Sequence, residues 1–99
     1  MQQEFHGILI NQTNLDIHHV AYACHVPTHW ILERLQAGLL TADVHSDLNT
    51  ARFDSNSLIR AQRMCAIERD FDANPELAAL VVDLMEQVAA LKSQLRCAL

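Results

Sequence analysis

The stretch HVPTHWILERLQAGLLTADVHSD, residues 25–47, reads as a turn, a short helix, a glycine stop and an extended run. Pro27 fits the first turn of a helix, where no amide donor is needed, and Thr28 is the alternative cap. Gly38 stands where a left-handed residue would end that helix. The apolar stripe of the helix consists of Ile31, Leu32 and Leu35. The stretch therefore predicts a turn, a helix and the start of a β-hairpin.

A helix is predicted immediately before this stretch. Residues 15–24 place four apolar side chains at positions i, i+3, i+4 and i+7, which is one face of a helix. These residues are Ile17, Val20, Ala21 and Cys24. Thr13 or Asn14 can cap the helix, because their side-chain oxygens accept free amide protons. Further upstream, EFHGILI at residues 4–10 predicts a short strand.

A hairpin and a third helix are predicted after the stretch. Residues 39–53 carry short apolar pieces around the polar tip HSDLNT, which is typical of a small β-hairpin. Asp54 or Ser55 caps the next helix, which reaches about Phe71. The order is helix, turn, helix, hairpin and helix, so the expected fold is mainly α, with a winged helix-turn-helix domain over residues 1–73.

Residues 74–99 predict a long C-terminal helix. Asn74 can cap it, Pro75 suits its first position, and the pattern runs to about Arg96. Its apolar residues are spaced 4, 3, 4, 3 and 4 apart: Leu77, Val81, Leu84, Val88, Leu91 and Leu95. Valine at a and leucine at d favour a two-stranded coiled coil. A wider stripe, to which Leu80, Val82 and Met85 contribute, favours packing on the helix's own domain.

We expect both kinds of packing in the C-terminal helix. Its first turns should pack on the winged domain, and its distal part should pair with a second copy of the chain. The contacts expected in this homodimer are Leu84, Val88, Leu91 and Leu95.

The charge of the chain argues against a nucleic-acid partner. The 99 residues carry a net charge of −5 and form one domain. Residues 15–53, which would hold any DNA-reading face, contain Arg34 and Arg52 but no lysine. The same segment contains Asp16, Glu33, Asp43 and Asp47. A protein that makes about six to ten phosphate contacts needs several more cations there.

The compartment is predicted from the cysteines and from the absence of long apolar runs. Cys24, Cys65 and Cys97 are odd in number and widely spaced, which suits reduced thiols in the cytoplasm. No apolar run approaches the roughly 20 residues that span a bilayer. The start MQQEFHG lacks the basic region and the cleavage pattern of a secretion signal, so secretion is not expected.

The stretch VPTHWILERLQAGLL, the wing after it and ARFDSNSLIRAQRM together resemble the winged-helix domain of MerR-type regulators. The strand before the first helix, FD before the third helix and NPEL before the heptad helix bring the chain closest to the CbpM-like chaperone modulators. The resemblance implies a protein that binds the J-domain of a DnaJ-like co-chaperone of the CbpA type and inhibits it. It implies no enzymatic activity and no cofactor.

The chain departs from the DNA-binding members of the MerR type. Those members carry paired basic and aromatic residues on the second helix and a Tyr-Arg pair in the wing. THWILERLQ and TADVHSDLNTARF lack both features. The alternative function is a dimeric transcriptional regulator that binds DNA through the winged helix. MerR-type dimers pair the C-terminal helix antiparallel, whereas the heptad by itself favours a parallel pair, so the polarity stays open.

The candidate binding residues follow from the chemistry of the expected partner, a J-domain. J-domains use a basic second helix and an adjacent His-Pro-Asp loop to engage Hsp70, and an acidic surface with an aromatic anchor would cover that helix. The candidate charges are Glu68, Asp70 and Asp72, and the candidate anchors are Trp30 and Phe71. The acidic wing tip, with Asp43 and Asp47, is the competing surface. The acids after Glu68 also fit ordinary helix-end chemistry.

No catalytic or metal-binding motif is present. Four of the six histidines lie close together, but none shows the spacing of a known metal site. Cys24 precedes His25, yet Cys24 lies on the apolar face and is expected to be a buried, inert thiol. Arg60 and Arg63 form a small basic patch, which we interpret as a solvated surface.

Overall fold

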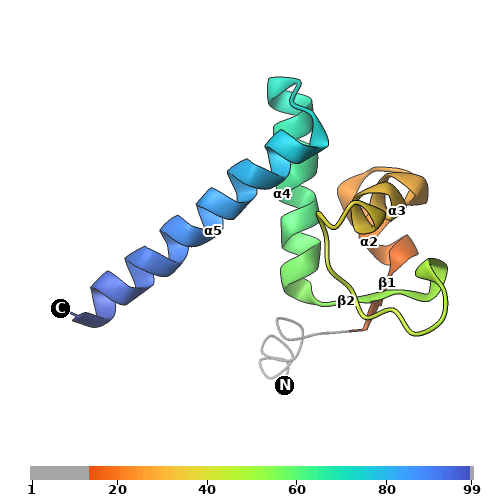
Figure 1. Ribbon diagram of the computed structural model, residues 1–99, viewed down its shortest axis with the longest axis horizontal. Helices are drawn as coiled ribbons and strands as arrows, with labels where there is room; N and C mark the ends of the chain where they lie inside the picture. Colours follow the sequence, from red (N-terminus) through yellow and green to blue (C-terminus); the bar gives the residue numbers. More distant parts are fainter. Residues whose placement is uncertain (1–13, 99) are drawn as a thin grey trace, which may run out of the picture.

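The computed structural model describes residues 14–98, so the strand expected at residues 4–10 lies outside the described residues. Within residues 14–98 the chain forms four α-helices and one two-stranded antiparallel sheet (Figure 1). In chain order the elements are β1 (Leu15–Asp16), α2 (Ile17–Cys24), α3 (Thr28–Gln36), the 3₁₀ turn η1 (Leu48–Thr50), β2 (Arg52–Phe53), α4 (Ser55–Phe71) and α5 (Pro75–Ala98). The predicted order of helices is confirmed.

The first helix, α2, begins later than the sequence suggested. Asp16 caps it, because its Oδ1 accepts the N–H of His19 at 2.8 Å. This hydrogen bond holds the pKa of the Asp16 carboxyl below its ordinary value. The prediction of Thr13 or Asn14 as the cap is wrong, because β1 keeps the chain extended as far as Asp16.

The second helix, α3, ends at the glycine as predicted. Pro27 occupies the cap position ahead of α3 without a side-chain hydrogen bond. At the other end Gly38 has a φ of 79°, and its N–H donates to the carbonyl of Leu35 at 3.1 Å. The N–H of Leu39 donates to the carbonyl of Arg34 at 2.9 Å. These two bonds form a Schellman motif, which turns the chain sharply into the wing.

The wing is smaller than the hairpin expected over residues 39–53. Its two sides meet at one bridge, where Asp43 and Arg52 exchange backbone hydrogen bonds of 2.8 and 2.9 Å. The longer pairing of β2 is with β1, with Leu15 opposite Phe53 and Asp16 opposite Arg52. The tip cannot extend the ladder, because the Asp47 carboxylate accepts the N–H of Asn49 at 2.8 Å and starts η1.

The core lies where α2, α3, α4 and β2 meet. All four apolar residues on the predicted inner face of α2 are buried, which confirms that face: Ile17, Val20, Ala21 and Cys24. Ile31 of α3, Phe53 of β2 and Met64 of α4 are fully buried beside them. The helix-turn-helix is therefore held rigidly against α4.

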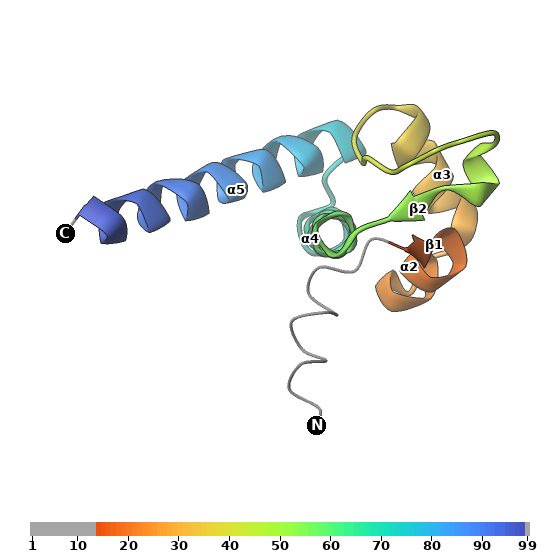
Figure 2. The ribbon, with the colours of Figure 1, turned by 90° about the horizontal axis from the view of Figure 1, so that it is seen from below.

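The C-terminal helix, α5, begins as predicted and continues to Ala98 rather than ending near Arg96. Asn74 caps it, because its Oδ1 accepts the N–H of Leu77 at 2.8 Å. Only the first turns pack on α4, through Ala78, Ala79 and Val82. The remainder extends away from α4, on the side opposite α2, α3 and the wing (Figure 2). No helix within residues 14–98 is long and apolar enough to cross a membrane.

Candidate functional site

The only arginine of α3 points into the molecule. Arg34 is 8% exposed, and its guanidinium donates two hydrogen bonds to the carboxylate of Glu68 on α4, at 2.7 and 3.3 Å. It also donates to the carbonyl of Trp30 at 3.3 Å and to the carboxylate of Glu33 at 3.1 Å. Its carbon Cζ lies 3.9 Å from the centre of the Trp30 ring. The cation on this helix is thus neutralised inside the fold.

This arrangement leaves the helix-turn-helix and the wing with little exposed positive charge. Over residues 15–53, Arg52 is the one exposed arginine, and no lysine is present. The acidic side chain of Glu33 is 64% exposed on the outer side of α3. Asp43 and Asp47 are exposed in the wing. The surface that would read DNA is therefore acidic.

The five residues predicted to bind a partner fall into two groups. Trp30 is half-buried and Glu68 is largely buried, and both are engaged by Arg34. The other three are exposed, and they end α4 and begin the connection to α5: Asp70, Phe71 and Asp72. We name these three residues the α4–α5 corner, which is visible at the top of α4 (Figure 1). The sequence could not separate the groups, because Arg34 and Glu68 are 34 residues apart.

The α4–α5 corner combines an exposed aromatic ring with two acids. Phe71 is 75% exposed. Asp72 adopts a left-handed conformation, with a φ of 53°, and ends α4. Among residues 14–98, the ion pair of Asp70 is with its neighbour Arg69, at 3.3 Å on an exposed surface, where such pairs contribute little. The corner can therefore contact an apolar surface bordered by cations.

The wing offers a second acidic surface. Asp43 and Asp47 lie on either side of Val44, which is 42% exposed. The side chain of Asp47 is held by its bond to Asn49, and the backbone of Asp43 is held by its bridge to Arg52. This surface is exposed, and hydrogen bonds hold it at Asp43 and at Asp47.

One exposed aromatic was not singled out from the sequence. Tyr22 is 83% exposed on α2, between the buried residues of that helix. Its position five residues after Ile17 and two residues before Cys24 lies off the buried stripe and would have identified it as outward-facing.

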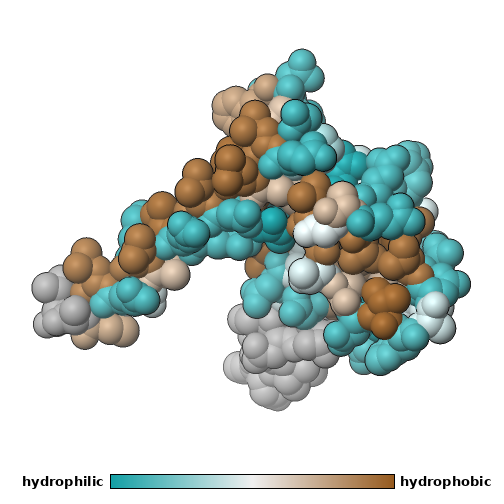
Figure 3. Space-filling view, in the orientation of Figure 1, coloured by the Kyte–Doolittle hydropathy of each residue, from teal (hydrophilic) through white to brown (hydrophobic). Residues whose placement is uncertain are grey.

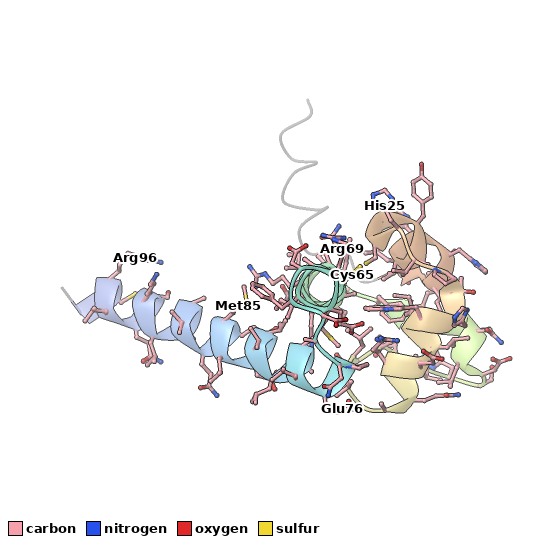
Figure 4. The ribbon with its side chains drawn as sticks, turned by 90° about the horizontal axis from the view of Figure 1, so that it is seen from above. His25, Cys65, Arg69, Glu76, Met85 and Arg96 are labelled. Atoms are coloured by element: carbon pink, nitrogen blue, oxygen red, sulfur yellow. The ribbon has the colours of Figure 1, made fainter. Side chains whose placement is uncertain are left out.

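Two of the cysteines, Cys24 and Cys65, lie in contact where α2 packs on α4. Burial raises the pKa of the Cys24 thiol to about 11, with a further contribution from Cys65, so the thiolate is disfavoured. The Cys65 thiol donates to the carbonyl of Cys24 at 3.5 Å. His25, Cys65 and Arg69 gather where α2 meets α4 (Figure 4). Within residues 14–98, no three His, Cys, Asp or Glu side chains are grouped to hold a metal ion.

The basic patch predicted at Arg60 and Arg63 is partly structural. Arg60 donates to the carbonyl of Leu39 at 2.8 Å and contacts the carboxylates of Asp83 at 2.8 Å and Glu86 at 3.3 Å. It lines an open cleft between the end of α3, α4 and α5. Its two ion pairs join α4 to the first half of α5.

The fold and this surface define a helix-turn-helix protein with a short wing and a projecting C-terminal helix. The model of the MerR HTH family regulatory proteins matches residues 15–97. The chain therefore belongs to this family. No curated protein and no solved structure gives a significant match.

Proposed function

We propose that this chain is a non-enzymatic modulator that binds the J-domain of a DnaJ-like, CbpA-type co-chaperone and inhibits its co-chaperone activity. The observation that carries the proposal is the burial of Arg34 against Glu68. Because Arg34 is buried, Arg52 is the one exposed arginine over residues 15–53. A shape suited to the major groove is combined with a surface that repels phosphate. The resemblance to the CbpM-like branch supplies the class of partner.

Electrostatics supports a basic partner. The basic second helix of a J-domain is complementary to an acidic surface, and such complementarity raises the rate of encounter. Two exposed acidic surfaces are available: the α4–α5 corner and the wing with Asp43 and Asp47. Covering the basic helix would compete with Hsp70 for the same J-domain.

The alternative function is a dimeric transcriptional regulator. Membership of a family of helix-turn-helix regulatory proteins favours it. It requires the acidic face of α2, α3 and the wing to bind DNA.

The test of the proposal uses the full chain and the cognate co-chaperone. Calorimetry should show a complex with the isolated J-domain, and the chain should suppress J-domain stimulation of the Hsp70 ATPase. Fluorescence anisotropy with duplex DNA at low salt should show weak binding without sequence preference. Nanomolar, sequence-selective DNA binding together with unchanged ATPase stimulation would refute the modulator function and support the alternative of a transcriptional regulator.

A further inference from the structure

Two cysteines that are 41 residues apart in the sequence lie in contact in the fold. Cys24 is the last residue of α2, and Cys65 belongs to α4. The Sγ of Cys65 lies 3.5 Å from the carbonyl oxygen of Cys24. Covalent geometry holds the Cβ of a residue roughly 3 Å from its own carbonyl oxygen, so the Cys65 sulfur lies within a few ångströms of the Cys24 side chain.

The pKa of the Cys24 thiol also shows that the two thiols are neighbours. Burial raises this pKa to about 11, and like-charge repulsion from Cys65 adds to the increase. Such repulsion acts over a short range inside a protein, so the two side chains must lie close together. The fold therefore brings together two thiols from two helices that pack on each other.

The two thiols differ in their access to solvent. Cys24 is 5% exposed, whereas Cys65 is half-buried and can be reached from outside. A dissolved oxidant therefore reacts at Cys65 first, because the reactive thiol must be accessible. Cys24 can then react only with a group that is already attached to Cys65.

We propose that Cys24 and Cys65 are a redox modification site and form a disulfide bond in the presence of a low-molecular-weight disulfide, such as oxidised glutathione. The thiolate of Cys65 attacks one sulfur of this oxidant, a bond forms between Cys65 and one glutathione, and the other glutathione leaves as a thiolate. Cys24 gives up its proton to solvent, and its sulfur displaces the remaining glutathione from Cys65. The two protein thiols are oxidised to one disulfide, and the oxidant is reduced to two glutathione thiols.

The bond stabilises the helix-turn-helix by connecting α2 to α4. It closes a loop that contains α3 and the wing, and a cross-link restricts the unfolded chain more when the loop is long. We therefore expect the oxidised chain to melt about 10 °C higher than the reduced chain. The exposed apolar residues of α5 lie on the projecting helix (Figure 3), away from this contact, so the bond leaves that surface unchanged.

The test uses the full chain carrying Cys97→Ser, because Cys97 is exposed and would form bonds between chains. After incubation with excess oxidised glutathione at mildly alkaline pH, the mass of the intact chain should fall by two hydrogen atoms. Peptide mapping should place the bond between Cys24 and Cys65. A chain that keeps one glutathione on Cys65, or in which both thiols stay free, would overturn the proposal.

Two further variants in the same background test the order of the two steps. Cys24→Ala should keep glutathione on Cys65, because no second thiol displaces it. Cys65→Ser keeps a donor for the carbonyl of Cys24 and should stay unmodified, because Cys24 is buried. Glutathione attached to Cys24 in the Cys65→Ser variant would contradict this order.

The stabilising effect is measured by thermal unfolding before and after the same treatment. The melting temperature should rise in the chain that has both Cys24 and Cys65 and should stay constant in Cys65→Ser. An equal rise in Cys65→Ser would show that the bond is not the cause, and a decrease on oxidation would contradict the stabilising role. Far-ultraviolet circular dichroism of the untreated variants checks that they fold.

Discussion

At the scale of single residues, the burial of Arg34 determines the charge on the surface of the helix-turn-helix. A two-bond contact between a guanidinium and a carboxylate fixes both side chains, and stacking on the Trp30 ring removes the remaining freedom of the arginine. The same contact joins α3 to α4, because Glu68 belongs to α4. One ion pair therefore positions a helix and at the same time removes a cation from the surface.

Glu68→Ala should destabilise the protein by about 1–3 kcal/mol, because it leaves the largely buried Arg34 without its main partner. The stacked geometry of Trp30 should loosen, and its fluorescence emission should shift to longer wavelength. Urea unfolding followed by fluorescence measures both effects.

The matched control for this variant is Glu33→Ala. Glu33 also contacts Arg34, at 3.1 Å, but its side chain is 64% exposed. The decrease in the free energy of unfolding should stay below about 0.5 kcal/mol, as is usual for an exposed ion pair. Equal decreases in the free energy of unfolding of the two variants would show that the contact with Glu68 stabilises the protein no more than the exposed contact with Glu33.

At the scale of elements, the helix caps and the glycine that ends α3 could be predicted from the sequence, because each depends on neighbouring residues. Asp54, Asn74 and Gly38 act within one turn of their helices, as local patterns indicate. The wing was predicted less accurately from the sequence. Strand β2 pairs mainly with β1, and a single bridge between Asp43 and Arg52 closes the expected hairpin. The choice between these strands depends on tertiary packing.

The candidate site was less predictable than the fold, for the same reason. Exposure of Asp70, Phe71 and Asp72 follows from their position at a helix end. The engagement of Glu68 and Trp30 by Arg34 depends on how α3 packs on α4, which no local pattern encodes. Heptad spacing on α5 identified the apolar surface, but it could not show that packing on the domain stops after Val82.

The projecting part of α5 should depend on association for its order. A lone helix of about 15 residues is marginal in water, and here the apolar residues beyond Val82 are exposed in the single chain. Leu91→Asp should therefore yield a monomer whose helix frays over residues 84–98. Sedimentation measures the first effect, and hydrogen exchange of the backbone amides measures the second.

Ser93→Asp is the control for Leu91→Asp, since it adds the same charge to the same exposed helix on the side away from the leucine residues. It should remain dimeric and protected. A Leu91→Asp variant that is dimeric and fully protected would contradict the expectation.

At the scale of the whole molecule, the two acidic surfaces lie on different parts of the fold. The wing belongs to the helix-turn-helix side, and the α4–α5 corner lies where the projecting helix begins (Figure 1). On the proposed function, each of the two surfaces is a candidate for the contact with the basic helix of the J-domain.

Paired charge reversals should show which of the two acidic surfaces meets the J-domain. Asp43→Lys with Asp47→Lys should slow association with the J-domain by about tenfold and weaken its dependence on salt, because charged rims act mainly on the rate of encounter. Asp70→Lys with Asp72→Lys is the matched reversal at the α4–α5 corner, and the larger of the two effects identifies the surface that meets the basic helix of the J-domain. Stopped-flow kinetics at several salt concentrations measures both association rates. Association at the wild-type rate by both variants would contradict a role of either acidic surface in the encounter.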